Sequence, residues 1–223
     1  MPRRKTILAN GEYYHVFNRG VASIPIFKNQ SSYKRFINLI DYLQYGNTPT
    51  SFSNFLKHSI ADRQEIVTKL QIENRQLIEI ISFCLMPNHY HFVLLQKVDK
   101  GISKFIANLQ NSYGKYFNLR FNRTGPLVQP SFKAVRIETN EQLLHVTRYI
   151  HLNPITSFLV NEIEFLSYEW SSLPDYITNI RRYSFVNTDI VLDILESEQY
   201  KEFVLDQINY QQELHKIRHI MLE

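Results

Sequence analysis

The sequence predicts an α+β protein in which strands and amphipathic helices alternate, and three observations lead to this prediction. Apolar residues make up 44% of the 223 residues, which is enough for a substantial core. Short strand-like apolar segments alternate with segments whose apolar side chains recur at helical spacing. Only 6 glycines are present, so glycine-rich linkers and phosphate-cradling loops are not expected.

The first part of the chain is predicted to contain a strand, a helix and an insertion. Arg19-Gly20 closes the strand. Ser31 and Ser32 are favourable N-caps for the helix, because their hydroxyls can accept hydrogen bonds from free N–H groups of its first turn. The run Gly-Asn-Thr-Pro at 46–49 stops the helix. The elements are a strand at 12–18, a helix at 33–45 and, in a polar insertion at 50–76, one helix around 62–69.

The middle of the chain is predicted to contain a hairpin and two helices. Pro87 and Asn88 form the turn of the hairpin. Thr139 and Asn140 cap the second helix, and Pro154 is expected to end it, because a proline disfavours helical backbone in the residue before it. The elements are strands at 77–86 and 89–96, a long amphipathic helix at 102–121, extended segments within 127–137 and a helix at 141–152.

The order of these elements is strand, helix, two strands, helix and strand, followed by a further helix. This β-α-β-β-α-β order is the ferredoxin-like pattern, an antiparallel sheet with helices on one face. Right-handed crossovers put the helices at 33–45 and 102–121 on that face. We expect one domain over residues 1–157, ending in the helix that carries the candidate site, and a helical extension over 158–223.

The net charge of +4 conceals an asymmetry along the chain. Residues 1–153 carry 20 Lys or Arg against 9 Asp or Glu, a balance of +11, whereas residues 154–223 carry 5 against 12, a balance of −7. The basic part favours a polyanionic partner, and an ordinary solvated surface is the alternative. The extension is expected to be acidic.

Cysteine usage and hydropathy indicate the compartment. The single Cys84 lies in an apolar run, excludes an intramolecular disulfide and fits a reducing compartment. The basic N-terminus is not followed by the apolar stretch of a signal peptide, and no run approaches the roughly 18 apolar residues of a membrane span. We expect a cytoplasmic protein without a membrane partner.

Two short segments far apart in the sequence carry candidate site residues. His89 and His91 are two positions apart in a predicted strand, so their side chains point the same way. Tyr149 and Asn153 are four positions apart near the end of a predicted helix and share a face. Two imidazoles, a carboxamide and a phenol could converge on one divalent metal and one nucleophile, which suits the cleavage of a phosphodiester.

The donor types indicate Mg²⁺ or Mn²⁺ as cofactor. His89, His91 and Asn153 are neutral ligands, which leave coordination positions open and keep the metal's full charge available to polarise a phosphate. Tyr149 is the candidate nucleophile. A free phenol has a pKa of about 10, so a nearby metal or a cation such as Arg148 is needed to favour the phenolate. The alternatives are structural histidines and a core tyrosine.

Four motifs occur in a fixed order: Tyr-Tyr-His-Val-Phe-Asn-Arg-Gly at 13–20, Leu-Met-Pro-Asn-His-Tyr-His at 85–91, Tyr-Ile-His-Leu-Asn-Pro at 149–154 and Tyr-Glu-Trp-Ser-Ser at 168–172. In order and spacing they resemble the motifs of the single-tyrosine HUH transposases, and above all the branch of REP-associated tyrosine transposases. The resemblance implies a ferredoxin-like fold, Mg²⁺ or Mn²⁺, and cleavage of single-stranded or hairpin DNA that leaves a 5′-phosphotyrosine and a free 3′-OH.

The resemblance also implies a role for each site residue. His89 and His91 match the metal ligands, Tyr149 the catalytic nucleophile and Asn153 the third ligand. The expected protein is a transposase, a metal-dependent DNA endonuclease and strand transferase, acting as a monomer or homodimer. Five basic residues are candidate DNA contacts: Arg19, Lys115, Lys133, Arg136 and Arg148.

Other residues and functions were weighed against this interpretation. Tyr113 and Tyr116 are the alternative nucleophiles, but neither has an Asn or Gln four positions on. Tyr113 is better interpreted as a packing residue. His151 is expected to point away from Tyr149, and Trp170 to dock the C-terminal segment or to stack a base. A domesticated hairpin-binding protein without turnover, and a metal hydrolase that does not use Tyr149, are the competing functions. A covalent protein–DNA adduct separates the three.

Overall fold

Residues 6–178 and 180–212 are described by the structure, a computed structural model. Its elements in chain order are β1 (Tyr13–Arg19), the 3-10 helix η1 (Val21–Ser23), α1 (Gln30–Leu43), α2 (Phe52–Phe55), α3 (Ile60–Ile72), β2 (Ile78–Met86), β3 (His89–Gln96), α4 (Gly101–Arg120), β4 (Lys133–Ile137), α5 (Asn140–Thr156), α6 (Glu162–Phe165), α7 (Leu173–Ile177), α8 (Asp189–Leu192) and α9 (Ser197–Leu205).

The strands form a four-stranded antiparallel sheet in the order β2-β3-β1-β4. Each β-α-β unit of the chain is split by a third strand, because β3 lies between β1 and β2, and β1 lies between β3 and β4. This order follows from the predicted sequence of elements and is the split arrangement expected for it. The predicted α+β class with an antiparallel sheet is confirmed.

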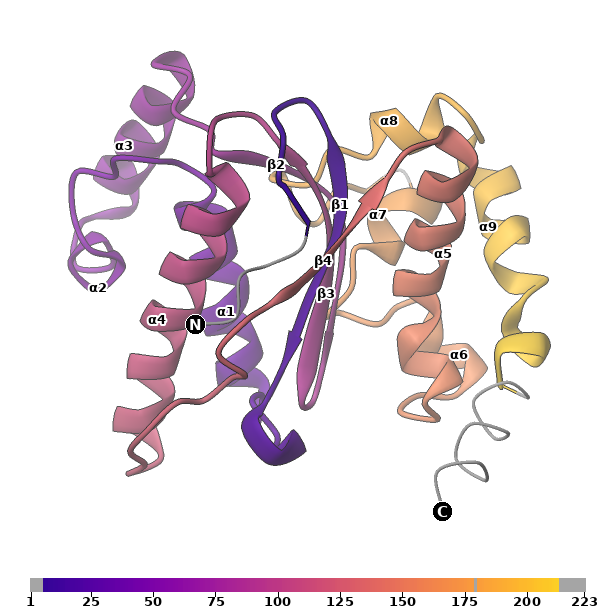
Figure 1. The fold of residues 1–223 in the computed structure, drawn as a ribbon, viewed down its shortest axis with the longest axis horizontal. Helices are drawn as coiled ribbons and strands as arrows, with labels where there is room; N and C mark the ends of the chain where they lie inside the picture. The colour runs from indigo at the N-terminus through magenta and orange to yellow at the C-terminus, as the bar shows by residue number, and fades with distance from the viewer. Residues whose placement is uncertain (1–5, 179, 213–223) are drawn as a thin grey trace. The chain divides into compact units, whose positions relative to one another are not determined.

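The contacts divide the chain into two compact units, and the first contains residues up to Glu79, Pro87–His89 and Leu94–Arg136. In this unit α1 and α4 contact each other and lie side by side (Figure 1). Aromatic rings fill the space near them: the ring centroids of Phe36 and Tyr113 are 4.9 Å apart, and Phe27 lies 5.5 Å from Tyr113. These large rings form the core of the unit.

The second unit contains Ile80–Met86, Tyr90–Val93 and the chain from Ile137 onward. The segment after α6 runs along β2 and is joined to it by backbone hydrogen bonds. The Leu85 N–H donates to the Trp170 carbonyl at 2.8 Å, and the Asn187 N–H donates to the Ile80 carbonyl at 2.8 Å. The boundary expected between residues 157 and 158 stays a prediction.

Two predicted helix boundaries were wrong, each for a local reason. α1 begins at Gln30, because the Asn29 side chain accepts the capping hydrogen bond from the Ser32 N–H at 3.0 Å, so Ser31 and Ser32 lie inside the helix. α5 continues to Thr156 and contains Pro154. The second difference bears on the site and is explained below.

The predicted insertion contains two helices instead of one. α3 was predicted, but the four-residue helix α2 was not. α2 forms because Phe52 and Phe55 are buried, and the Phe55 ring stacks on that of Tyr42 from α1 with centroids 4.3 Å apart. So short a helix has no periodicity to detect, and only its tertiary contacts define it.

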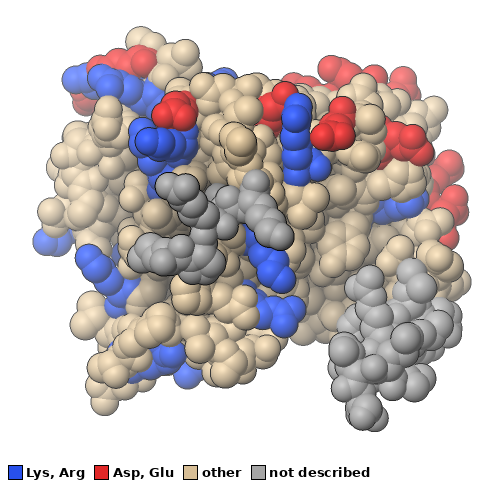
Figure 2. Space-filling view, viewed as in Figure 1, with Lys and Arg blue, Asp and Glu red and all other residues tan. Residues whose placement is uncertain are grey.

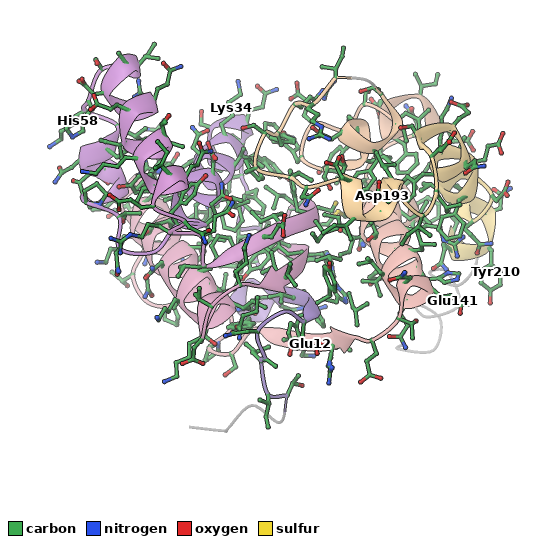
Figure 3. All side chains as sticks on the ribbon, turned by 90° about the horizontal axis from the view of Figure 1, so that it is seen from above. Glu12, Lys34, His58, Glu141, Asp193 and Tyr210 are labelled. Atoms are coloured by element: carbon green, nitrogen blue, oxygen red, sulfur yellow. The ribbon has the colours of Figure 1, made fainter. Side chains whose placement is uncertain are left out.

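Acidic side chains gather over the C-terminal helices, as the charge asymmetry predicted (Figure 2). One of them, Asp193 after α8, is labelled in Figure 3. None of the helices within residues 6–178 and 180–212 combines the length and apolar character needed to cross a bilayer.

Candidate active site

Strand β3 carries both candidate histidines. The Pro87-Asn88 turn starts the strand at His89, so His89 and His91 are two positions apart in extended backbone and are directed to one side of it. His89 is half-buried, whereas His91 is only 5% exposed. The hairpin predicted from the sequence therefore has the register that the site needs.

The Asn88 side chain fixes the ring of His89. Asn88 Oδ1 lies 2.6 Å from His89 Nδ1, and Asn88 Nδ2 donates to the Ser23 carbonyl at 3.3 Å. Since an amide oxygen can only accept, Nδ1 carries a hydrogen, and in the neutral ring the lone pair is then on Nε2. Metal-binding histidines commonly have their second ring nitrogen held in this way. In the sequence Asn88 is marked only as a turn residue, and no local pattern reveals its contact with His89.

Helix α5 presents Tyr149 next to His91. The ring centroids of Tyr149 and His91 are 5.9 Å apart and nearly perpendicular, with an interplanar angle of 87°. Tyr149 is 42% exposed although it lies near the middle of a long helix. The phenol is thus held by an edge-to-face contact and remains accessible to a ligand from solvent.

Asn153 explains why α5 continues through Pro154. A proline cannot donate the backbone hydrogen bond that would satisfy the Ile150 carbonyl. Asn153 Nδ2 donates to the Tyr149 carbonyl at 2.8 Å and lies 3.4 Å from the Ile150 carbonyl. The donor end of the amide is therefore used by the helix, and Oδ1 is the end that suits a cation.

His151 ties α5 to the C-terminal segment. It is fully buried, and its Nδ1 and Nε2 lie 2.8 Å from the Tyr200 hydroxyl and 2.9 Å from the Ser172 hydroxyl. Ser172 Oγ in turn accepts from the Phe83 N–H of β2 at 2.9 Å. Burial lowers the pKa of His151 to about 3, so the imidazole is neutral. His151 points away from Tyr149, as predicted, and it is a core residue.

Arg148 of α5 is held by contacts with Phe203 of α9 and with His145. Its guanidinium donates to the Phe203 carbonyl at 3.1 Å, lies 3.8 Å from the Phe203 ring centroid, and contacts His145 Nδ1 at 2.8 Å. These contacts stabilise α9 against α5. A DNA contact by Arg148 stays a prediction and would compete with them.

The other predicted DNA contacts lie in the first unit. Arg19, Lys115 and Lys133 are exposed. Arg136 forms an ion pair with Glu12 at 2.7 Å, which reduces its availability to a phosphate. The ammonium of Lys133 lies 5.8 Å from the centroid of the Phe17 ring.

The alternative nucleophile Tyr113 is a core residue. It is 1% exposed, and its hydroxyl donates to the Ile26 carbonyl. Burial raises its pKa well above that of a free phenol. Tyr113 therefore packs the first unit, as the sequence favoured.

The predicted metal ligands are His89, His91 and Asn153. Among residues 6–178 and 180–212, no three or more His, Cys, Asp and Glu side chains gather as a metal site would require. The predicted set has only two such residues and takes its third donor from an amide. Asn88 orients the His89 ring and the helix uses Nδ2 of Asn153, and binding of a divalent ion by His89, His91 and Asn153 stays a prediction.

The comparisons with known proteins agree with the motifs. Residues 53–153 match the family described as IS200-like transposase. A solved structure described as a REP-associated tyrosine transposase bound to a REP hairpin is similar to the chain, with a TM-score of 0.52 and 13% identity over 85% of this chain and 90% of that one. At this identity the likeness shows the fold alone. No curated protein sequence matches the chain.

The motifs, the family match over residues 53–153 and the fold together support the class of single-tyrosine HUH transposases. The family match is to the IS200-like type, and the likeness to the REP-associated transposase is one of fold. The recognition made from the four sequence motifs is thereby supported.

Proposed function

We propose that the protein cleaves and rejoins single-stranded or hairpin DNA through a covalent bond to Tyr149. The observation that carries this proposal is the pairing of an exposed phenol with a buried histidine of β3, 5.9 Å apart between ring centroids. A packing tyrosine would bury its hydroxyl, as Tyr113 does. A tyrosine used as a nucleophile must leave its oxygen accessible to a phosphate.

In the proposed cleavage step, Tyr149 Oη attacks a DNA phosphorus and the bond from phosphorus to the 3′ oxygen breaks. The phenol loses its proton, and the leaving 3′ oxygen gains one to become a 3′-OH. The 5′ phosphate stays on the protein as a phosphotyrosine ester. Because one phosphodiester replaces another, the reverse attack by a 3′-OH can rejoin the strands.

A divalent ion, Mg²⁺ or Mn²⁺, would be held by His89, His91 and Asn153, and would supply the positive charge that polarises the scissile phosphate. Asn88 supports this role by fixing the orientation of the His89 ring through Nδ1. The edge-to-face contact with His91 keeps Tyr149 beside this ligand. The hydrogen bonds of His151 hold the helix that carries Tyr149.

The proposed substrate is DNA with unpaired bases, including hairpins. The basic balance of residues 1–153 favours a polyanion. The structurally similar transposase is described as bound to a REP hairpin. Arg19, Lys115 and Lys133 are exposed and would contact phosphates, with Arg136 and Arg148 available only if their present partners are exchanged.

The proposal is tested by trapping the covalent intermediate. The protein is incubated with 5′- and 3′-labelled hairpin oligonucleotides and Mn²⁺, and the products are separated on a denaturing gel. The wild type is expected to retain label from the fragment 3′ of the cut, because its 5′ phosphate is bound to protein. Tyr149→Phe should bind DNA and form no adduct, whereas Tyr116→Phe should form it normally.

Each alternative gives its own result. Cleavage without a trapped adduct would indicate a hydrolase. Hairpin binding without cleavage in either metal would indicate a non-catalytic DNA-binding protein.

A further inference from the structure

Strand β1 carries a row of aromatic rings that the proposed chemistry does not use. Its side chains alternate between buried and half-buried along the whole strand. Tyr14 and Val16 are fully buried on one side. Tyr13, His15 and Phe17, here named the β1 aromatic row, are half-buried on the other. Because β1 is an inner strand between β3 and β4, this row lies within the sheet and not at its edge.

Two rings of the row, those of His15 and Phe17, lie next to each other. The centroids of His15 and Phe17 are 4.8 Å apart with an interplanar angle of 31°. Burial lowers the pKa of His15 to about 4, so this ring is neutral near pH 7. The row therefore offers π-faces along the strand.

Basic and apolar groups lie next to this row. The Lys133 ammonium of β4 lies 5.8 Å from the Phe17 centroid, which places Lys133 on the same side of the sheet as the row. Val135, two positions further along β4, shares that side and is 56% exposed. Arg19 ends β1 with an exposed side chain. The Phe17 end of the row thus combines rings with cations, as binding of a nucleic acid strand requires.

The opposite end of the row is acidic. Burial and, after it, the charge of Glu79 raise the pKa of Tyr13, and Glu12 forms an ion pair with Arg136. A phosphate backbone is therefore expected to lie over Phe17, Lys133 and Arg19, with bases directed toward the rings.

Sheets with this architecture are known to bind bases. In a common RNA-binding domain, aromatic residues on a four-stranded sheet stack two or three unpaired bases. Stacking does not depend on the base identity, since every base has a π-face. The β1 aromatic row and its cations provide the same groups in this chain.

We propose that the β1 aromatic row is a stacking platform for unpaired DNA bases, centred on Phe17 and flanked by Lys133 and Arg19. This inference rests on the proposed function, since its ligand is the single-stranded DNA that Tyr149 would cut. It adds a base-binding site outside the predicted catalytic and metal-binding residues.

The test compares two oligonucleotides that differ only in their bases. One is a short fluorescent single strand, and the other has the same length with abasic positions in its centre. Binding is measured in EDTA, so that no cleavage takes place, over a range of salt concentrations. Phe17→Leu keeps the apolar volume but removes the ring. Tyr210→Leu, which alters another exposed tyrosine, is the matched control.

Wild type should bind the intact strand more tightly than the abasic strand. Phe17→Leu should weaken binding of the intact strand by about tenfold, as expected for the loss of one stack, with an unchanged salt slope. It should leave binding of the abasic strand unchanged, and Tyr210→Leu should affect neither. Lys133→Gln should weaken both and lower the log–log salt slope by about 0.7.

Two results would overturn the stacking platform. One is an equal loss of affinity for the intact and the abasic DNA strand in Phe17→Leu, measured on protein whose thermal unfolding matches wild type. The other is wild-type affinity for the intact strand in that variant. If wild type forms the Tyr149 adduct in the presence of metal, either result leaves the proposed function standing. If wild type binds no single strand at all, the proposed function itself fails.

Discussion

Helices α4 and α5 each carry a tyrosine, and the two rings lie in opposite environments. Tyr113 of α4 is 1% exposed and uses its hydroxyl to satisfy a backbone carbonyl inside the first unit. Tyr149 of α5 is 42% exposed, and its ring is held against His91. The difference separates two roles among the tyrosines. Burial makes Tyr113 a core residue, whereas exposure leaves Tyr149 able to act as the proposed nucleophile.

The helices themselves are also held differently. α4 contacts α1 through rings in the apolar core of its unit. α5 is fastened by polar groups on either side of Tyr149, since Arg148 contacts Phe203 and His151 contacts Tyr200 and Ser172. Because these contacts fix the rotation of α5 about its own axis, Tyr149 is exposed in a constant direction. The acidic C-terminal helices therefore contribute to the placement of Tyr149.

The largest effect is expected from removing the histidine beside Tyr149. His91→Ala should abolish adduct formation, because it removes both a predicted metal ligand and the ring that Tyr149 contacts. DNA binding in EDTA should stay within about twofold of wild type, since His91 is 5% exposed and offers little surface to DNA. Quantitative gels and fluorescence anisotropy measure the two effects. Adduct formation at the wild-type rate would remove His91 from the site.

The next effect concerns the histidine held by Asn88. Asn88→Ala should weaken Mn²⁺ binding by about 10- to 100-fold, because the His89 ring loses the acceptor that fixes its tautomer. Isothermal titration calorimetry measures the affinity. Nitrogen-15 NMR of the metal-free protein should show His89 protonated on Nδ1 in wild type and a mixture of tautomers in Asn88→Ala. A single unchanged tautomer in the variant would contradict the role of Asn88.

A pH effect should distinguish α5 from α4. The pKa of His151 is lowered from 6.5 to about 3 by burial, so the unfolded chain binds a proton that the folded chain excludes. The contribution of this group to stability is therefore complete above about pH 6.5 and decreases as the pH falls toward 3, by up to about 1.4 kcal/mol per pH unit.

Denaturant unfolding between pH 7 and pH 4 measures this effect. His151→Gln, which does not titrate and can still form hydrogen bonds, should show a shallower decrease than wild type. His15 also has a lowered pKa, about 4, and accounts for part of the remaining slope. Parallel curves for wild type and His151→Gln would mean that His151 is charged in the folded protein or is not buried.

The smallest effect is expected at Tyr113. Tyr113→Phe removes the hydroxyl that donates to the buried Ile26 carbonyl and should lower the free energy of unfolding by about 1–3 kcal/mol. Adduct formation measured on the folded variant should be unchanged. If Tyr113→Phe had normal stability but formed no adduct, the nucleophile would be Tyr113 of α4 and not Tyr149 of α5.

Much of this arrangement could be predicted from the sequence, because the relevant signals are local. The Pro87-Asn88 turn placed the start of β3 at His89, and the order of strands and helices gave the fold class. Tyr149 and Asn153 were placed on one helix because their spacing matches a helical turn.

The remaining features depend on side-chain contacts, most of them between distant residues. The end of α5 was predicted too early, since the compensation for Pro154 comes from a side chain. α2 exists because its two phenylalanines are buried against α1. The His151 contacts join residues 21 and 49 positions apart, which no local pattern reveals.

The central claim is that Tyr149 forms the bond to DNA, and peptide mapping of the trapped adduct tests it most directly. The wild-type adduct is digested with a protease and a nuclease, and the nucleotide-bearing peptide is sequenced by mass spectrometry. The account predicts a single modified peptide with a 5′-phosphonucleotide on Tyr149. A modified peptide that contains Tyr113, Tyr116 or any other tyrosine, with Tyr149 unmodified, would contradict it.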